Sequence, residues 1–161
     1  MPRKNLREFR GKPLVMWAVE HAEECKYIDF IICSTDDAEI EKLVHPKVWT
    51  SMRPAELSTD AASSEDTIRH VLVNHPHDWV VLLQPTSPLR TAEDIDACIE
   101  RAQLGDGCIS VNRANGLTNG AVYVARASWI AVHDFNHLGL MKYVMDEERS
   151  LDIDNEEDFQ K

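Results

Sequence analysis

The sequence lacks the features that would place it in a membrane or on nucleic acid. No apolar run approaches the roughly 20 residues needed to cross a bilayer, and the opening MPRKNLREFRGK has no signal-peptide stretch. The 17 basic and 28 acidic side chains give a formal net charge of −11, whereas nucleic acid and anionic membranes bind basic surfaces. We therefore expect a cytoplasmic protein that binds neither nucleic acid nor membrane.

Cysteine is scarce and scattered. Cys25, Cys33, Cys98 and Cys108 lie apart in the sequence and form no CxxC pair. This usage predicts buried, reduced thiols and no disulfide framework. The sequence also contains no GxSxG, Walker A or GxGxxG motif. Serine hydrolases, P-loop nucleotidases and dinucleotide-dependent oxidoreductases therefore lose their main sequence support.

Helical and strand patterns alternate along the 161 residues, which have room for one domain. Residues 14–25 place apolar side chains on one helix face. Trp79 to Leu83 is apolar on both faces, as a central parallel strand requires. Thr91 to Asp94 forms a capping box for the next helix. We expect one domain over residues 1–161, with a three-layer α/β fold and a mostly parallel sheet.

The remaining elements are expected from shorter patterns. Strands are predicted at Ile28–Cys33, near Val48, and at Cys108–Val111, Ala121–Val124 and Leu140–Met145, and helices at Ile40–Val44, Ile68–Leu72 and Ser128–Val132. Ligands of such sheets bind beyond the carboxyl ends of the strands. The segments that follow the strands are therefore the candidates for a functional site.

The segment QPTSPLR, residues 84–90, follows the predicted central strand. Its two prolines fix the backbone, while Gln84, Thr86, Ser87 and Arg90 offer polar groups to a ligand. A proline-stiffened turn that caps the next helix is an equally good interpretation of this pattern alone.

Asp152 and Asp154 follow the last predicted strand. In an extended backbone, carboxylates at i and i+2 point to one side, so both could approach a hard cation such as Mg²⁺. A solvated acidic tail is the alternative, because residues 146–161 carry eight acids and two bases.

Two basic segments could contact phosphate or a nucleotide base. Arg53 precedes Pro54 and follows a predicted strand, although a surface salt bridge to Glu56 or Asp60 would also explain it. Lys4 and Asn5 offer a point charge and an amide near the basic N-terminus, where a frayed terminus is an equally good account.

Taken together, the segments resemble one known family. They are PRKNL (2–6), GKPL (11–14), STDD (34–37), RPAEL (53–57), ASS (62–64), LLQPTSPLR (82–90), NGAVY (119–123) and SLDID (150–154). This succession resembles the acylneuraminate cytidylyltransferases, which are the CMP-sialic acid synthetases and their relatives acting on other nine-carbon acid sugars. The resemblance covers nearly the whole chain, and LLQPTSPLR with SLDID is specific to that family.

The resemblance implies a reduced Rossmann-like nucleotidyltransferase fold and a cytidylyltransferase activity. A sialic acid or related nonulosonate and CTP would give the CMP-sugar and pyrophosphate. Asp152 and Asp154 would bind Mg²⁺, which neutralises the triphosphate and could acidify the attacking hydroxyl. Lys4 would contact the phosphates and complete the catalytic set with these two aspartates.

The other site residues implied by the resemblance divide between nucleotide and sugar. Asn5 would contact the nucleotide beside Lys4, and Arg53 and Ser64 would help hold the cytidine. Gln84 would orient the acid sugar, Thr86 and Ser87 would shape its loop, and Asn119 would line the same pocket. The choice among sialic, legionaminic, pseudaminic and shorter keto-acid sugars stays open.

Two departures from the family pattern leave present activity open. Family members usually begin with a strand and a basic, glycine-containing loop that cradles the triphosphate, whereas PRKNL opens this sequence. Only residues 112–118 stand where the family has a long excursion that helps to form the dimer and completes the sugar pocket. The sequence fits a truncated product, a reduced homologue that binds CTP but turns over poorly, or a non-catalytic protein used for binding or assembly.

Two further expectations follow. Without its first strand, the sheet would expose an edge and apolar surface that proteins normally cover, which predicts a homo-oligomer. A DxD pair on a nucleotide-binding α/β fold is also typical of metal-dependent glycosyltransferases, which bind a sugar that is already activated. The QPTSPLR loop favours the cytidylyltransferase, which binds free nucleoside triphosphate.

Overall fold

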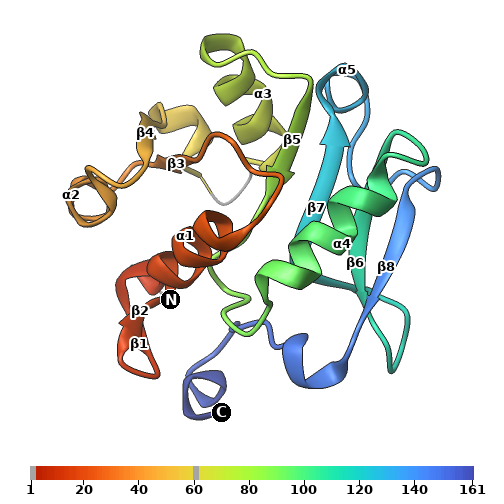
Figure 1. Cartoon of the computed structure of the whole chain (residues 1–161). Coiled ribbons are helices and arrows are strands. Elements are labelled where there is room, and N and C mark those ends of the chain that lie inside the picture. The colour runs from red at the N-terminus through yellow and green to blue at the C-terminus, as the bar shows by residue number, and fades with distance from the viewer. Residues whose placement is uncertain (1–2, 60–61) are drawn as a thin grey trace.

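The fold is taken from a computed structural model, in which residues 3–59 and 62–161 are described. The helices are α1 (Leu14–Glu24), α2 (Ala38–Val44), α3 (Ser64–Asn74), α4 (Ala92–Ala102) and α5 (Ala127–Ile130) (Figure 1). The strands are β1 (Glu8–Phe9), β2 (Lys12–Pro13), β3 (Ile32–Thr35), β4 (Trp49–Met52), β5 (Trp79–Leu82), β6 (Gly107–Asn112), β7 (Thr118–Arg126) and β8 (Met141–Met145). Short 3₁₀ turns lie at Lys4–Leu6, Ala55–Leu57, Glu147–Arg149 and Glu157–Gln160.

The main sheet has four strands in the order β5-β7-β6-β8. β7 pairs antiparallel with both β5 and β6, while β6 and β8 are parallel. Three strands therefore run in one direction, as the sequence predicts, and β7 runs against them. The reason is the short connection of residues 113–117, because strands joined by a short hairpin loop must pair antiparallel. The central parallel strand predicted at Trp79 to Leu83 is wrong in its position, because within the described residues β5 lies at the edge of the sheet and pairs antiparallel with β7.

Helices cover both faces of the main sheet, which gives the predicted three layers. On one face, Ile95 and Cys98 of α4 pack with Val122 and Val124 of β7. On the other face, side chains of α3 and α5 pack against the sheet; they include Ile68, Trp129 and Ile130, with Ile109 and Ala125 from the strands. Figure 1 shows α4 lying along the sheet. Alternation along the strands thus sends side chains into two separate apolar cores.

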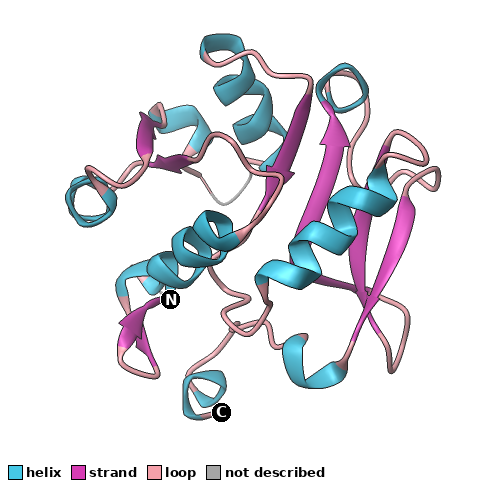
Figure 2. Cartoon of the chain, viewed as in Figure 1, coloured by secondary structure: helices cyan, strands magenta, loops and turns pink. Residues whose placement is uncertain are grey.

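β3 and β4 form a second, parallel two-stranded sheet. Its core joins Val15 and Val19 of α1 to Ile40 and Val44 of α2. Within residues 3–59 and 62–161, no strand pairs with the second edge of β3 or of β5, and the two sheets stand apart in Figure 2. The end of α1 is fastened to α4, because the backbone N–H of Lys26 donates to Asp96 Oδ1 (3.0 Å).

The capping residues predicted from the sequence do cap the starts of their helices. Thr91 and Asp94 exchange the two hydrogen bonds of a capping box at the start of α4, and the side chain of Ser63 caps α3. All four cysteines are free thiols, and all but Cys33 are buried. No helix in the part of the chain that the structure describes is both long and apolar enough to span a membrane.

Candidate functional site

The QPTSPLR loop and the acidic C-terminal segment lie against each other. The N–H of Ile153 donates to the carbonyl of Thr86 (2.8 Å). The Ile153 side chain is fully buried and packs with Phe9 and Leu14. One residue between the two predicted metal ligands therefore anchors the segment in the core and beside the loop.

Gly120 brings the start of β7 to the same place. Its backbone is left-handed (φ +74°), and a Cβ atom there would lie 3.1 Å from Gln84 Oε1 and 3.2 Å from Asp152 Oδ2. Such contacts are tighter than side chains normally make, and a positive φ disfavours any residue but glycine. The amide of Gln84 and the carboxylate of Asp152 thus meet over a position that has room only for glycine.

Lys4 reaches this group from the N-terminal 3₁₀ turn. Its Nζ donates to the carbonyl of Ile153 (2.8 Å) and lies 3.9 Å from Asp154 Oδ1. The Asp154 side chain is 75% exposed, so the lysine is held mainly by the carbonyl. A point charge fixed beside two carboxylates in this way is suited to contact a phosphate that a metal ion also binds.

Asp152 has the most unusual environment in the group. Burial raises the pKa of its carboxyl, and Asp154 adds to this, whereas a hydrogen bond with the Thr86 side chain and the charge of Lys4 lower the pKa. Oδ1 is buried and has no hydrogen-bond partner among the residues described. Burying a carboxylate oxygen without a hydrogen-bond partner costs free energy, and a bound hard cation would offset this cost.

The donor set therefore fits a hard divalent cation, and Mg²⁺ stays the predicted ion. No cluster of three or more His, Cys, Asp or Glu side chains that could hold a metal occurs in the described ranges. Two aspartates are enough for Mg²⁺, which keeps water and substrate phosphates as its other ligands. Asp152 and Asp154 would hold the ion.

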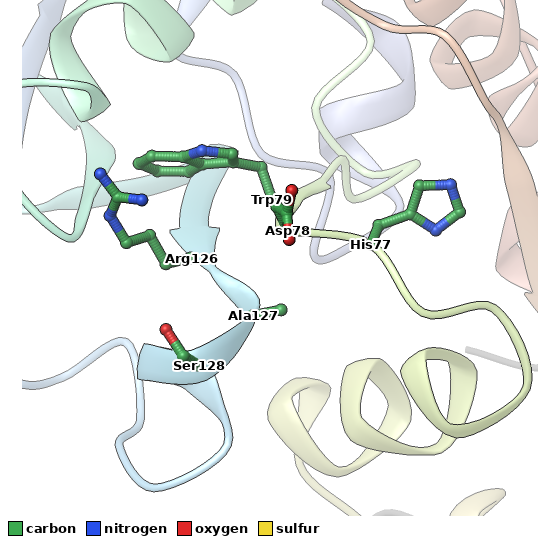
Figure 3. A pocket seen from close by; sticks show the side chains of 6 residues that line it. All are labelled: His77, Asp78, Trp79, Arg126, Ala127 and Ser128. Atoms are coloured by element: carbon green, nitrogen blue, oxygen red, sulfur yellow. The ribbon is translucent and has the colours of Figure 1, made fainter.

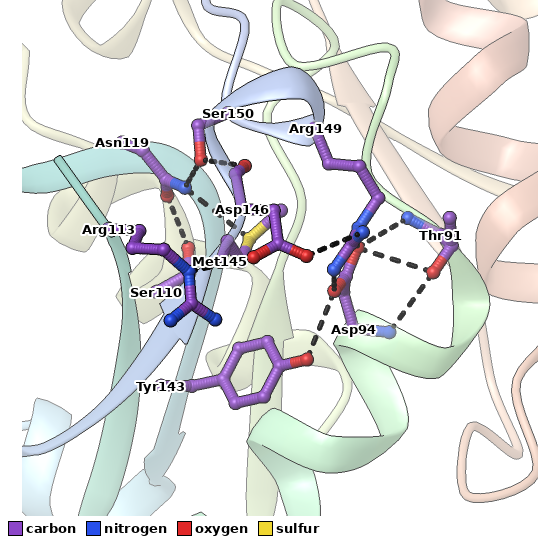
Figure 4. A network of polar contacts seen from close by, with 10 residues as sticks. All are labelled: Thr91, Asp94, Ser110, Arg113, Asn119, Tyr143, Met145, Asp146, Arg149 and Ser150. Carbon is purple, nitrogen blue, oxygen red and sulfur yellow. Dashed lines mark hydrogen bonds and ion pairs between the residues drawn. The ribbon is translucent and has the colours of Figure 1, made fainter.

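Asn119, predicted to line the sugar pocket, has its side chain inside the protein (Figure 4). Its Oδ1 accepts from Ser110 Oγ (2.6 Å), and its Nδ2 donates to Ser150 Oγ (2.9 Å). Ser150 in turn donates to the carbonyl of Asp146 (2.9 Å). The contact with sugar stays a prediction that this placement does not favour. The position of Asn119 instead ties the start of β7 to the segment that leads to Asp152.

A second part of this network was not predicted from the sequence. Asp94, buried at the start of α4, pairs with Arg149 (Oδ2 to Nε, 3.0 Å) and accepts from the Tyr143 hydroxyl (3.1 Å) (Figure 4). Arg149 also reaches Asp146 (3.1 Å). The only sequence signal was the capping box of Asp94, which says nothing of a partner 55 residues away. The pair fixes the backbone three residues before Asp152.

The predicted cytidine contacts lie elsewhere. Arg53 follows β4 and donates to Asp36 Oδ1 (3.1 Å), and its buried Nε has no partner in the described part of the chain. Ser64 is the first residue of α3. Across residues 3–59 and 62–161, no hydrogen bond or ion pair joins Asn5, Arg53 or Ser64 to the group around Asp152. The structure brings together Lys4, Gln84, Thr86, Asp152 and Asp154. It buries Ser87 beside them in the loop, and the Ser87 Oγ has no partner among the described residues.

A separate hollow of about 250 Å³ lies at the other end of the main sheet (Figure 3). Trp79, which begins β5, and Arg126, which ends β7, line it together with His77 and Asp78. The Arg126 guanidinium lies 4.5 Å from the centre of the Trp79 ring. Because Gln84 and Gly120 lie at the opposite ends of these strands, the hollow is not part of the candidate site.

Known proteins resemble this chain in sequence. The sequence model of a family described as Cytidylyltransferase matches residues 1–137. An N-acylneuraminate cytidylyltransferase of Escherichia coli O18:K1:H7 is 27% identical over an alignment of 195 positions, gaps included, which covers 98% of this chain and 46% of the relative. A pseudaminic acid cytidylyltransferase of Campylobacter jejuni is 31% identical over 108 residues, which cover 63% and 47%. The chain spans about half the length of these relatives.

Solved structures share the fold. CMP:2-keto-3-deoxy-manno-octonic acid synthetase, solved with CTP, matches with a TM-score of 0.71 at 12% identity, over 91% of this chain and 84% of that chain. A protein of Mycobacterium tuberculosis H37Rv, solved with manganese, matches with a TM-score of 0.70 at 15% identity, over 98% and 89%. The predicted Rossmann-like nucleotidyltransferase fold is thereby confirmed.

Proposed function

Because the chain belongs to the cytidylyltransferase family, as its motifs predict, we propose that it joins CMP from CTP to an acid sugar of the sialic or pseudaminic type and releases pyrophosphate. The observation that carries the proposal is the meeting of Lys4, Gln84, Thr86 and Asp152 at one edge of the main sheet. The names of the curated relatives support this class of sugar.

In the proposed reaction, the anomeric hydroxyl of the sugar attacks the α-phosphorus of CTP. The new O–P bond forms as the bond to the bridging oxygen breaks, pyrophosphate leaves with the electron pair, and the hydroxyl proton passes to water. Catalysis then consists mainly of alignment and charge neutralisation. When bound, Mg²⁺ would neutralise the triphosphate and acidify the attacking hydroxyl.

The residues of the chain would divide this work. Asp152 and Asp154 would hold the metal ion, with Asp152 kept in place by Thr86. Lys4, fixed on the carbonyl of Ile153, would contact the phosphates. The Gln84 amide, beside Asp152, would orient the sugar. Arg53 and Ser64 remain the proposed contacts for cytidine.

Pyrophosphate release tests the proposal. The wild-type chain is incubated with CTP, Mg²⁺ and a panel of acid sugars, together with Asp152→Asn and the matched control Glu157→Gln, which changes an exposed acid of the same segment. We expect sugar-dependent release that falls about a hundredfold or more in D152N and persists in E157Q. Release that ignores the sugar, or equal loss in both variants, would contradict the proposal. CTP binding without turnover would favour the reduced, inactive homologue.

We also propose that the chain self-associates. Within the described ranges, β5 pairs only with β7 and β3 only with β4, which leaves two edges open to another strand. Trp49 on β4 is 64% exposed, which adds apolar surface nearby. Sedimentation velocity across the micromolar range is expected to show a mass that rises with concentration, and a constant monomer mass would refute the proposal.

A further inference from the structure

Arg90 is a buried guanidinium that the proposed reaction does not use. It is 1% exposed, and its Nη1 donates to two backbone carbonyls, those of Gln84 (2.7 Å) and Ala121 (3.0 Å). Nε and Nη2 are buried without partners in the described ranges, and no carboxylate there forms an ion pair with it. Burial lowers the pKa of this arginine to about 9. A buried, unpaired charge costs stability, so its position calls for an explanation.

The two carbonyls mark the point where β5 and β7 separate. The antiparallel ladder runs from Trp79 opposite Arg126 to Leu82 opposite Tyr123. Continued for two residues, this register sets Gln84 opposite Ala121, beyond the last pair of the ladder. One nitrogen of Arg90 binds both facing carbonyls, and it therefore joins the two backbones after their own hydrogen bonds have ended.

One joined residue, Gln84, belongs to the candidate site, and the other, Ala121, directly follows Gly120 of that site. The side chain of Gln84 approaches the position of a Cβ on Gly120 to 3.1 Å, and Asp152 Oδ2 approaches the same position to 3.2 Å. Gly120 directly precedes Ala121. A shift of either backbone would therefore change the distance between the Gln84 amide and the Asp152 carboxylate.

We propose that Arg90 is a positioning residue for the acid sugar, which acts by holding Gln84 against the Gly120–Ala121 backbone. This inference rests on the proposed function, because Gln84 is the residue expected to orient the sugar. Arg90 itself is buried and touches no substrate. It acts through the backbone, so its effect falls on sugar binding and not on the CTP site.

Arg69 supplies a matched control. It also donates to two carbonyls, from Nε to Ile130 (2.9 Å) and from Nη2 to His133 (2.9 Å). In contrast to Arg90, it pairs with Asp66 (3.0 Å) and Asp134 (2.7 Å). It fastens α3 to the segment around α5, so its loss affects packing without touching Gln84.

The experiment compares the wild type with Arg90→Lys and Arg69→Lys. Lysine keeps the charge, but its Nζ lies one bond nearer the backbone than the Nη1 that reaches both carbonyls. In R90K, we expect the KM for the sugar to rise about tenfold or more while the KM for CTP stays within about twofold. We also expect faster amide exchange in residues 84–89 and 119–122. R69K should show neither change. Arg90→Gln, which keeps N–H donors without the charge, replaces R90K if that variant does not fold.

A double mutant tests the route through Gln84. If Arg90 acts through this amide, R90K adds little to the sugar KM once Gln84→Ala is present. Equal rises in both KM values, additive effects in Q84A/R90K, or exchange in R90K no faster than in R69K would each overturn the inference. If the wild type releases no pyrophosphate, the proposed function fails, and the exchange comparison alone then decides whether Arg90 holds the two backbones together.

Discussion

The main sheet and the β3–β4 sheet are built from similar units, yet they differ in how well they are covered. β6 and β7 lie in the middle of the main sheet and are buried along most of their length. β4 has no fully buried residue, and Trp49 and Met52 on it are exposed. Gly120 lies within β7 of the covered sheet, whereas Arg53 follows β4 of the open one. We therefore expect Gly120 and the groups packed on it to be held more firmly than Arg53.

The largest effects are expected from truncating one core residue under each sheet. Ile95→Ala, on the fully buried face of α4, should lower the free energy of unfolding by about 2–5 kcal/mol. Val44→Ala, equally buried under the small sheet, should mainly accelerate amide exchange in α2, β3 and β4. Urea unfolding with exchange mass spectrometry measures both. The comparison fails if V44A loosens the main sheet as much as I95A does.

A smaller effect is expected from the polar network at the edge of the main sheet. Arg149→Met leaves the buried carboxylate of Asp94 without its ion pair and should cost about 1–3 kcal/mol. Arg113→Met removes a pair with Asp146 whose arginine is 66% exposed, and it should cost about 0–1 kcal/mol. Urea midpoints of the two variants give the difference. Equal midpoints would mean that burial of Asp94 adds nothing.

The smallest effect concerns His21 of α1, the helix that contacts both α2 and α4. Burial, together with the charges of Arg90 and Lys12, lowers the pKa of His21 from 6.5 to about 4. Between pH 6.5 and 4 the unfolded chain then binds the extra proton, so stability falls as the pH falls through this window. His21→Gln should flatten the slope of urea midpoint against pH. His77→Gln, at an exposed position, should keep the wild-type slope; equal slopes in all three proteins would contradict the prediction.

Local patterns in the sequence predicted most of the fold. The apolar run at Trp79 and the capping box at Thr91 became β5 and the start of α4. The strand predicted at Ile28–Cys33 instead begins at Ile32. The reason is that its pairing with β4 starts at Trp49, and Phe30 remains outside the ladder with its ring near that of His77. Apolar character alone does not reveal where a partner strand begins.

Only those site residues that belong to sequence motifs could be predicted. The motif residues Gln84, Thr86, Asp152 and Asp154 do lie close together, as the carboxyl ends of the strands suggest. Contacts between distant segments, such as Arg149 with Asp94, have no local signal. Asn119 illustrates the limit, because an amide in a site motif can equally well satisfy buried hydroxyls.

Ile153 protects the spacing of the acidic pair. The segment consists of a half-buried acid, a core isoleucine and an exposed acid, so burial of the isoleucine fixes which residues point inward and which point outward. Inserting or deleting one residue would push a carboxylate into the space between Phe9 and Leu14, where an ionised group is costly. The spacing of the two aspartates is thus fixed by a buried side chain that carries no ligand group of its own.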